Sequence, residues 1–420
     1  MMSEYRITKA AAYTINVAMA VVATISPLLF STFYSEYGIS YSLLGLLVLI
    51  NFCTQLGIDL LFSFFSHKFN IALTVRLTPL LTVAGIVLFA VLPFLFPQYA
   101  YAGLALGTIV FAASGGLSEV LISPIIAAIP SPDPERAMSR LHSVYAWGVV
   151  GVVLVSSGVL LAIGRENWHW LVLGWGIVPA VAAVLFFLAK IPPMQTPEKT
   201  SGAVGLFSSK PLVLCILCIF FGGASECTMS QWASGYLEQA LGLEKIWGDI
   251  FGVAMFALML GLGRSLYGAF GKRIYKVLIF GSAGAAVCYL AAALTPIPII
   301  GLIACGLTGL CVSMLWPGSL IAVTDHFPNA NVAVFALMAA GGDLGASVGP
   351  QITGLIADAV IASPAAADFA AGLGWTAEQL GMKAGILCCA IFPILAVVFS
   401  VLIYRLSKHK PFGLPLSEKK

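Results

Sequence analysis

The sequence predicts an all-α integral membrane protein with twelve transmembrane helices in two pseudo-symmetric six-helix halves. Of its 420 residues, 60% are hydrophobic and only 9% are charged, whereas a soluble domain carries about 25% charged residues. A soluble fold of this composition lacks the polar side chains to cover its surface. Twelve long apolar stretches and one hydrophilic break midway along the chain complete the basis for this prediction.

Each predicted span is long enough to cross a bilayer, which takes about 20 largely apolar residues. Clusters of Gly, Pro and charged residues separate the stretches. The first stretch lacks a small-residue cleavage site and is interpreted as a retained span. The spans cover residues 9–34, 42–66, 71–95, 99–129, 138–163, 168–190, 210–237, 247–270, 275–296, 298–324, 331–358 and 382–406.

The hydrophilic break divides the chain into two similar halves. It is rich in Pro, Ser, Thr and Gly and predicts a flexible cytoplasmic linker over 192–209, between a half at 1–191 and a half at 210–420. Residues 116–124 in span four align with 309–317 in span ten, and Asp59 in span two aligns with Arg264 in span eight. Parallel internal repeats of this kind are typical of secondary transporters.

The distribution of Lys and Arg predicts the orientation. With both termini cytoplasmic, most of the 21 basic residues lie on the inner side, and the outer loops hold only Arg165, Lys245 and Lys383. This favours a multi-pass protein of the cell (inner) membrane. We expect residues 362–381 to form an outer loop with a weakly helical piece, GWTAEQLG, and Asp358 to be solvated at an outer helix end.

Several functions are excluded by what the sequence lacks. The balance of 21 basic against 18 acidic residues offers no basic stripe for nucleic acid. No ATP-binding loop, metal cluster or nucleophile elbow is present, so we predict no enzyme activity, no cofactor and no metal. Uphill transport by such a protein draws on an ion gradient, in this case of protons.

Three acidic residues within the spans are predicted to couple protons: Glu119, Glu226 and Asp343. A charge at membrane depth is costly, and burial of a carboxylate favours its protonated form. Small and polar neighbours precede both glutamates, which favours a position facing a cavity. The alternative is a permanently protonated glutamate that donates a hydrogen bond between helices; for Asp343, the glycines around it equally suit helix packing.

A gating role is predicted for Asp59, Arg264 and His142. Asp59 and Arg264 occupy matching places in the two halves and suit an ion pair or charge relay, with a static bridge to other partners as the alternative. His142 follows Arg140 at the cytoplasmic mouth of span five. It suits a proton donor or, equally, a histidine whose hydrogen bonds are satisfied at the membrane–water interface.

Amides, hydroxyls and aromatic rings inside the spans predict a site for a neutral polyol. Amides pair with sugar hydroxyls, and a flat aromatic ring covers the C–H face of a sugar. Single aromatic residues more often serve in helix packing. The predicted substrate-binding residues are Asn16, Thr24, Asn51, Gln55, Tyr145, Trp147, Gln231, Trp232 and Trp316.

Two segments resemble a known family of transporters. One contains Glu119, Ser123-Pro124, a short charged loop and Ala137-Met-Ser-Arg-Leu-His142-Ser-Val-Tyr-Ala-Trp147-Gly148; the other is Gly223-Ala-Ser-Glu226…Trp232…Tyr236. They resemble helices four, five and seven of the fucose–galactose–glucose/proton symporter family of the major facilitator superfamily. The resemblance implies the major facilitator fold, proton-coupled uptake of monosaccharides, and Glu119 as the proton site. The loop after span two departs from the superfamily motif, since Ser63 to Asn70 lacks its glycines and its acidic residue.

The sequence thus predicts a proton-coupled symporter of a monosaccharide or a similar small polar solute that works by alternating access. Its partners are this solute, protons and the lipid bilayer, and we expect a monomer. The alternatives are a proton-linked exporter of amphipathic compounds and a membrane receptor that does not transport.

Overall fold

The computed structural model describes residues 4–65, 68–130, 134–192, 209–270, 273–326 and 332–408. Within these ranges the chain is helical and contains no strand. Twelve helical stretches are long and apolar enough to cross a membrane. The predicted fold class is therefore confirmed. The predicted linker falls almost entirely on residues 193–208, which lie outside the described residues.

The first half of the chain forms six spans, two of which are broken. The first span is interrupted at Leu29, two residues after Pro27, and the sixth at Gly176. The elements are α1 (Arg6–Leu28), α2 (Phe30–Tyr37), α3 (Tyr41–Phe65), α4 (Ile71–Leu95), η2 (Pro97–Tyr99), α5 (Ala100–Ala128), α6 (Pro134–Ile163), η3 (Arg165–Asn167), α7 (Trp168–Trp175) and α8 (Ile177–Leu188).

The second half also forms six spans, and the eighth, tenth and twelfth are built from more than one helix. The eighth contains a π-helical turn near its start. Such turns are rare in proteins overall, but those that occur often lie near functional sites. The elements are α10 (Lys210–Leu241), α11 (Lys245–Trp247), η4 (Gly248–Ala254), α12 (Met255–Phe270), α13 (Ile274–Leu294), α14 (Pro298–Val312), α15 (Leu315–His326), α16 (Val332–Ile361), α17 (Pro364–Gly372), α18 (Ala377–Cys389) and α19 (Ile391–Ser407).

The prediction of a loop over 362–381 is wrong for most of its length. Ser363 caps α17 by accepting a hydrogen bond from the amide of Ala366, with Pro364 at the first helical position. Thr376 then begins α18 with a capping box that includes Gln379. Ser-Pro and Thr-x-x-Gln are both helix-start signals, so these helices were visible in the sequence.

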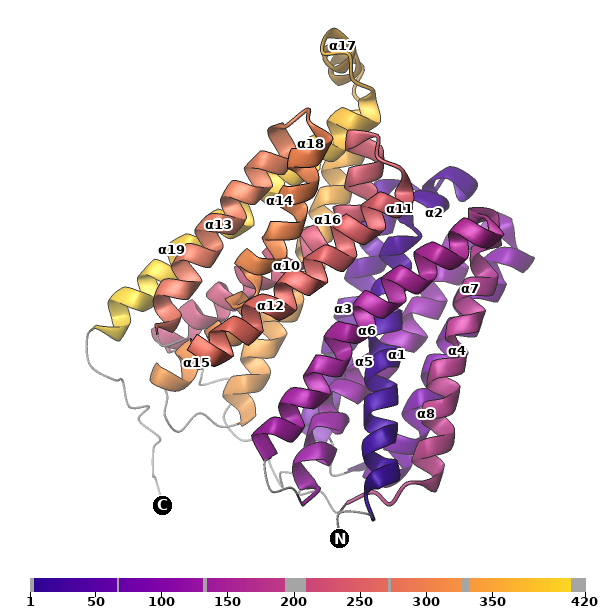
Figure 1. Cartoon of the computed structure of the whole chain (residues 1–420), viewed down its shortest axis with the longest axis vertical. Coiled ribbons are helices and arrows are strands. Elements are labelled where there is room, and N and C mark those ends of the chain that lie inside the picture. Colours follow the sequence, from indigo (N-terminus) through magenta and orange to yellow (C-terminus); the bar gives the residue numbers. More distant parts are fainter. Residues whose placement is uncertain are drawn as a thin grey trace.

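The two halves stand side by side and diverge toward the end of the molecule where α1 begins and α19 ends (Figure 1). We call this the terminal end, and the opposite end, which carries η3 and α17, the far end. At the terminal end, Lys190 after α8 donates a hydrogen bond to Glu4. This hydrogen bond, with the lysine charge, lowers the pKa of the Glu4 carboxyl.

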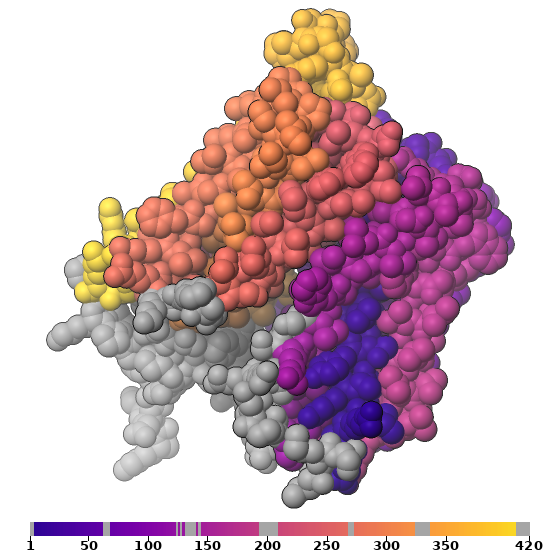
Figure 2. Space-filling model, in the orientation of Figure 1, coloured from indigo at the N-terminus to yellow at the C-terminus, as the bar shows by residue number. Residues whose placement is uncertain are grey.

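Toward the far end the halves are in close contact, as their surfaces show in the upper part of Figure 2. Helix α3 of the first half lies along α16 of the second. A Cβ on Gly45 would lie 2.9 Å from the carbonyl oxygen of Pro350, and one on Gly354 would lie 2.2 Å from that of Tyr41. These glycines let the two backbones approach as small residues do in membrane helix pairs.

Two lysines assigned to outer loops are instead buried. Lys245 is 7% exposed and Lys383 is 4% exposed. Lys383 lies within α18, where its Nζ donates to the Thr295 carbonyl at 2.5 Å and lies 5.1 Å from the centre of the Trp375 ring. Lysine at the end of a span is ordinarily interfacial, so no sequence pattern indicates this burial.

Candidate functional site

Three predicted acidic residues converge between the halves. Asp59 of α3, Glu119 of α5 and Asp343 of α16 lie close enough to interact electrostatically. All three lie on the terminal side of the middle of their helices. Carboxylates that approach one another cannot all be ionised at low cost, so this cluster is chemically able to hold protons.

Glycines on α5 explain why α3 reaches this cluster. A Cβ on Gly116 would lie 2.9 Å from Asp59 Oδ1, and one on Gly115 would lie 3.2 Å from Gln55 Cδ. Gln55, a predicted substrate-binding residue, therefore lies against the same stretch of α5 as Asp59. The glycines before Glu119 thus serve close helix packing and bring Asp59 to the glutamate.

The second predicted glutamate pairs with the predicted gating arginine. Arg264 of α12 places Nη2 3.3 Å from Glu226 Oε1 on α10, and its Nε donates to the Ser313 carbonyl at 3.1 Å. Tyr145 of α6 lies near enough to Glu119, Glu226 and Arg264 to interact with them electrostatically. In this structure, Arg264 is bound to Glu226 and Asp59 is grouped with Glu119. The gating roles of Asp59 and Arg264 stay predictions.

These groups are only partly enclosed by protein. Glu119 is exposed although it lies inside the bundle, and the side chains of Arg264 and Glu226 are 42% and 17% exposed. Asp59 Oδ1 and Glu226 Oε2 are buried with no hydrogen-bond partner in the described part of the chain. A buried oxygen without a partner is costly. Water, a proton or a solute hydroxyl would satisfy it.

Two predicted substrate-binding amides line the same small cavity. Asn51 of α3 and Gln231 of α10, one from each half, line it together with Ser26 of α1 and Thr108 of α5. Its volume of about 10 Å³ is close to that of one water site. Asn51 Oδ1, Ser26 Oγ and Thr108 Oγ1 have no hydrogen-bond partner among the described residues. The rest of the lining is apolar, so these oxygens are unsatisfied in a mostly apolar surrounding.

The tryptophans are not gathered at one site. Trp232 is 1% exposed, packs at an angle against the rings of Phe30 and Tyr41 from the other half, and donates its indole N–H to the Pro350 carbonyl at 3.0 Å. Trp316 fills a notch at Gly223 and Gly342, beside Asp343. Both rings serve helix packing in this structure, and their binding roles stay predictions.

Trp147 lies apart from its predicted companion Tyr145. It is 67% exposed and lines a separate groove between α1, α6 and α7. Two residues apart on an α-helix, side chains point about 200° from each other, so the structure does not bring Trp147 to the acidic cluster.

The remaining predicted residues have varied positions. Asn16 is buried and donates to the Leu141 carbonyl at 2.8 Å, which joins α1 to α6. Thr24 is buried on α1. The side chain of His142 lies outside those that the structure describes.

A buried ion pair at the far end was missed by sequence reasoning. Lys245 Nζ lies 2.5 Å from Asp249 Oδ1 on the π-helical turn η4, and the two side chains are 8% and 2% exposed. Ser234 of α10 bonds to both. Ser157 of α6, in the other half, donates to Asp249 Oδ2 at 2.9 Å. This network, which we call the Asp249 network, fixes the start of the eighth span to the fifth.

Two further polar contacts join the halves at the far end. Asp358, expected to be solvated, instead accepts the backbone amides of Tyr41 and Ser42 at 3.0 and 2.7 Å. It thus caps α3 from the other half, where a helix N-terminus favours negative charge. Arg165 of η3 donates to Glu238 of α10 at 2.7 Å. Both acids stand at helix ends, where sequence gives no sign of a distant partner.

Among the described residues, no group of three or more His, Cys, Asp or Glu side chains is arranged to hold a metal ion.

The family follows from a comparison with protein-family models. The Major Facilitator Superfamily model matches residues 12–350 of this chain. The chain belongs to the major facilitator superfamily. The members of this superfamily are transporters, and the predicted membership is confirmed. No curated protein sequence matches the chain significantly.

Solved structures share the fold at low sequence identity. A bacterial homolog of the human lysosomal transporter Spinster, inward-facing and unoccupied, gives a TM-score of 0.76 at 15% identity, covering 98% of this chain and 99% of that one. A D-xylose–proton symporter gives 0.75 at 14% identity, covering 97% and 99%. The fucose:proton symporter of E. coli gives 0.61 at 15%, covering 95% and 99%.

Proposed function

We propose that this protein is a proton-coupled symporter that carries a monosaccharide or a similar small polar solute by alternating access. The observation that carries this proposal is the convergence of Asp59, Glu119 and Asp343 from both halves, with Glu119 open to solvent. A proton-driven carrier needs an ionisable group that solvent reaches from one side and that responds to the position of both halves.

In the proposed cycle, protonation of Glu119 removes a buried charge and permits the halves to close over the solute. Loss of the proton on the other side then restores the charge and favours release. Glu226, paired with Arg264, and Asp343 are proposed as further members of the proton path. Tyr145 lies near both Glu119 and Glu226, and its hydroxyl is able both to donate and to accept a hydrogen bond.

The proposed solute is a neutral polyol because the polar groups that line the small cavity between the halves are amides and hydroxyls. Asn51 and Gln231 face one cavity from opposite halves, so separation of the halves would open it. Two structures that share this fold are proton symporters of xylose and fucose, in keeping with the proposal.

The orientation proposed from the basic residues places the terminal end in the cytoplasm of the cell and the protein in the inner membrane, as a monomer with halves at 1–191 and 210–420. The structure then corresponds to the state that is closed to the outside, because the contacts at the far end join the halves there.

The test is uptake of a panel of labelled monosaccharides into proteoliposomes, with and without an inward proton gradient. Accumulation of one sugar that requires the gradient is the expected result. If no sugar accumulates but a lipophilic cation is expelled in a proton-linked manner, the protein is the exporter and the symport proposal fails. If neither is moved, transport of these two solute classes is excluded.

A further inference from the structure

A groove on the side of the first half is separate from the acidic cluster. It has a volume of about 670 Å³, within the range of sites that hold small molecules. Helix α1 contributes its floor and α6 and α7 its walls. In Figure 2, the indigo surface of α1 lies between the magenta α6 and the pink helices that follow it. The lining residues are Tyr13, Val17, Arg140, Val144, Trp147, Gly148, Gly151, Val152, Val155 and Trp175.

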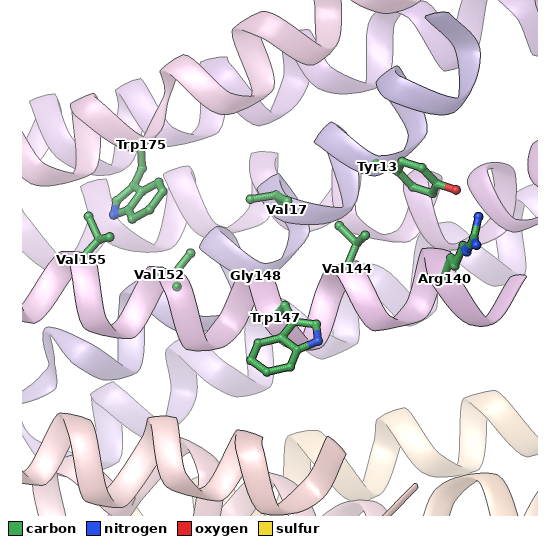
Figure 3. A pocket seen from close by; sticks show the side chains of 10 residues that line it. Tyr13, Val17, Arg140, Val144, Trp147, Gly148, Val152, Val155 and Trp175 are labelled. Carbon is green, nitrogen blue, oxygen red and sulfur yellow. The ribbon is translucent and has the colours of Figure 1, made fainter. Parts of the chain in front are cut away.

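The groove is apolar along most of its length and polar at one end. The valines lie within the apolar spans Arg6–Leu28 and Val144–Ile163, whereas Arg140 precedes the second span by one helical turn. Figure 3 shows the Arg140 guanidinium and the Tyr13 hydroxyl at one end of the groove, and Trp175 and Val155 at the other. Arg140 is exposed, and no described residue forms an ion pair with it.

Two glycines of α6 shape the groove. Gly148 lets α6 pack closely on α1, since a Cβ there would lie 3.0 Å from the Ala20 Cβ, whereas a Cβ on Gly151 would meet no atom within 4 Å. A larger side chain at position 151 would therefore occupy part of the groove without a clash.

We propose that this groove binds a phospholipid with an anionic headgroup from the leaflet at the terminal end. The acyl chain would lie along the valines at the depth of the hydrocarbon. The phosphate would pair with Arg140 and accept a hydrogen bond from Tyr13 at the depth of the headgroups. A lipid has this order of polar and apolar parts, and basic pockets between transmembrane helices on the cytoplasmic side suit anionic headgroups. The site goes beyond the proposed transport function and does not depend on it.

The test is native mass spectrometry of the full, delipidated protein in detergent, titrated with phosphatidylglycerol or phosphatidylcholine of the same acyl chains. Phosphatidylglycerol should bind more tightly. Arg140→Gln should weaken its binding about fivefold and leave phosphatidylcholine unchanged, because one basic residue contributes roughly this much near a membrane surface. Gly151→Leu should weaken binding of both lipids about tenfold or more, because it displaces several methylenes.

Gly158→Leu is the matched control. Gly158 is on the same helix, a Cβ there also meets no atom within 4 Å, and it lies outside the groove. This variant should bind lipid as the unchanged protein does. Equal binding of the two lipids, or no effect of Gly151→Leu, would overturn the proposal. A dimer that Gly151→Leu dissociates would also overturn it, since a second copy would then occupy the groove.

Discussion

The far end and the acidic cluster differ in how their polar groups are satisfied. At the far end, Asp249 is bonded by groups from both halves, and Asp358 accepts two backbone amides from the other half. In the cluster, Asp59 Oδ1 has no partner among the described residues, and Glu119 faces solvent. The proposed function therefore assigns closure to the bonded groups of the far end, and the binding of a proton and a solute to the groups whose oxygens have no partner.

The largest effect is expected for Asp249→Asn. It leaves the Lys245 charge buried without its carboxylate, and removing one partner of a buried pair costs about 3–5 kcal/mol. We expect a clear fall in the midpoint of thermal unfolding in detergent. The double variant Lys245→Gln with Asp249→Asn should regain much of the loss, because no unpaired charge remains. If the single variant is as stable as the unchanged protein, the network does not hold the far end.

An intermediate effect is expected for Asp358→Ala. Loss of a helix cap costs about 0.5–2 kcal/mol, here at the first turn of α3. Hydrogen–deuterium exchange of the Tyr41 and Ser42 amides should therefore accelerate about two- to thirtyfold. Asp368→Ala, which changes an exposed aspartate in α17, is the control and should leave exchange in α3 unchanged. Unchanged exchange in Asp358→Ala would remove this contact from the account of closure.

The smallest effect is expected for Arg165→Gln. The pair with Glu238 is partly exposed, at 44% and 14% of the two side chains, and such pairs contribute about 0.2–1 kcal/mol that salt screens. The shift in thermal midpoint should be small and should shrink further at high salt. A shift as large as that of Asp249→Asn would mean that closure depends on this surface pair instead.

Much of the fold could be predicted from sequence because apolar runs interrupted by glycine, proline and charge are a local signal. The acidic residues of the site were visible for the same reason, since Glu119 stands out within an apolar run. Their partners were not visible. Arg264 pairs with Glu226, 38 residues away, and Asp358 caps a helix more than 300 residues away. Only the tertiary arrangement brings these pairs together.

Local helix geometry accounts for two other differences between the prediction and the structure. Trp147 follows Tyr145 by two residues and so lies on the opposite side of α6, where it lines the groove between α1, α6 and α7. Lys245 looked like an ordinary loop residue, and its burial depends on a π-helical turn that has no clear sequence signal.

The most direct test of the proton site is Glu119→Gln in proteoliposomes, with the transported solute measured in two modes. The account predicts that exchange of labelled for unlabelled solute persists, whereas accumulation driven by the proton gradient is lost. Glu166→Gln, which changes an exposed glutamate at the far end, should retain both modes. Full gradient-driven accumulation by Glu119→Gln would contradict the assignment of the coupling proton to this residue.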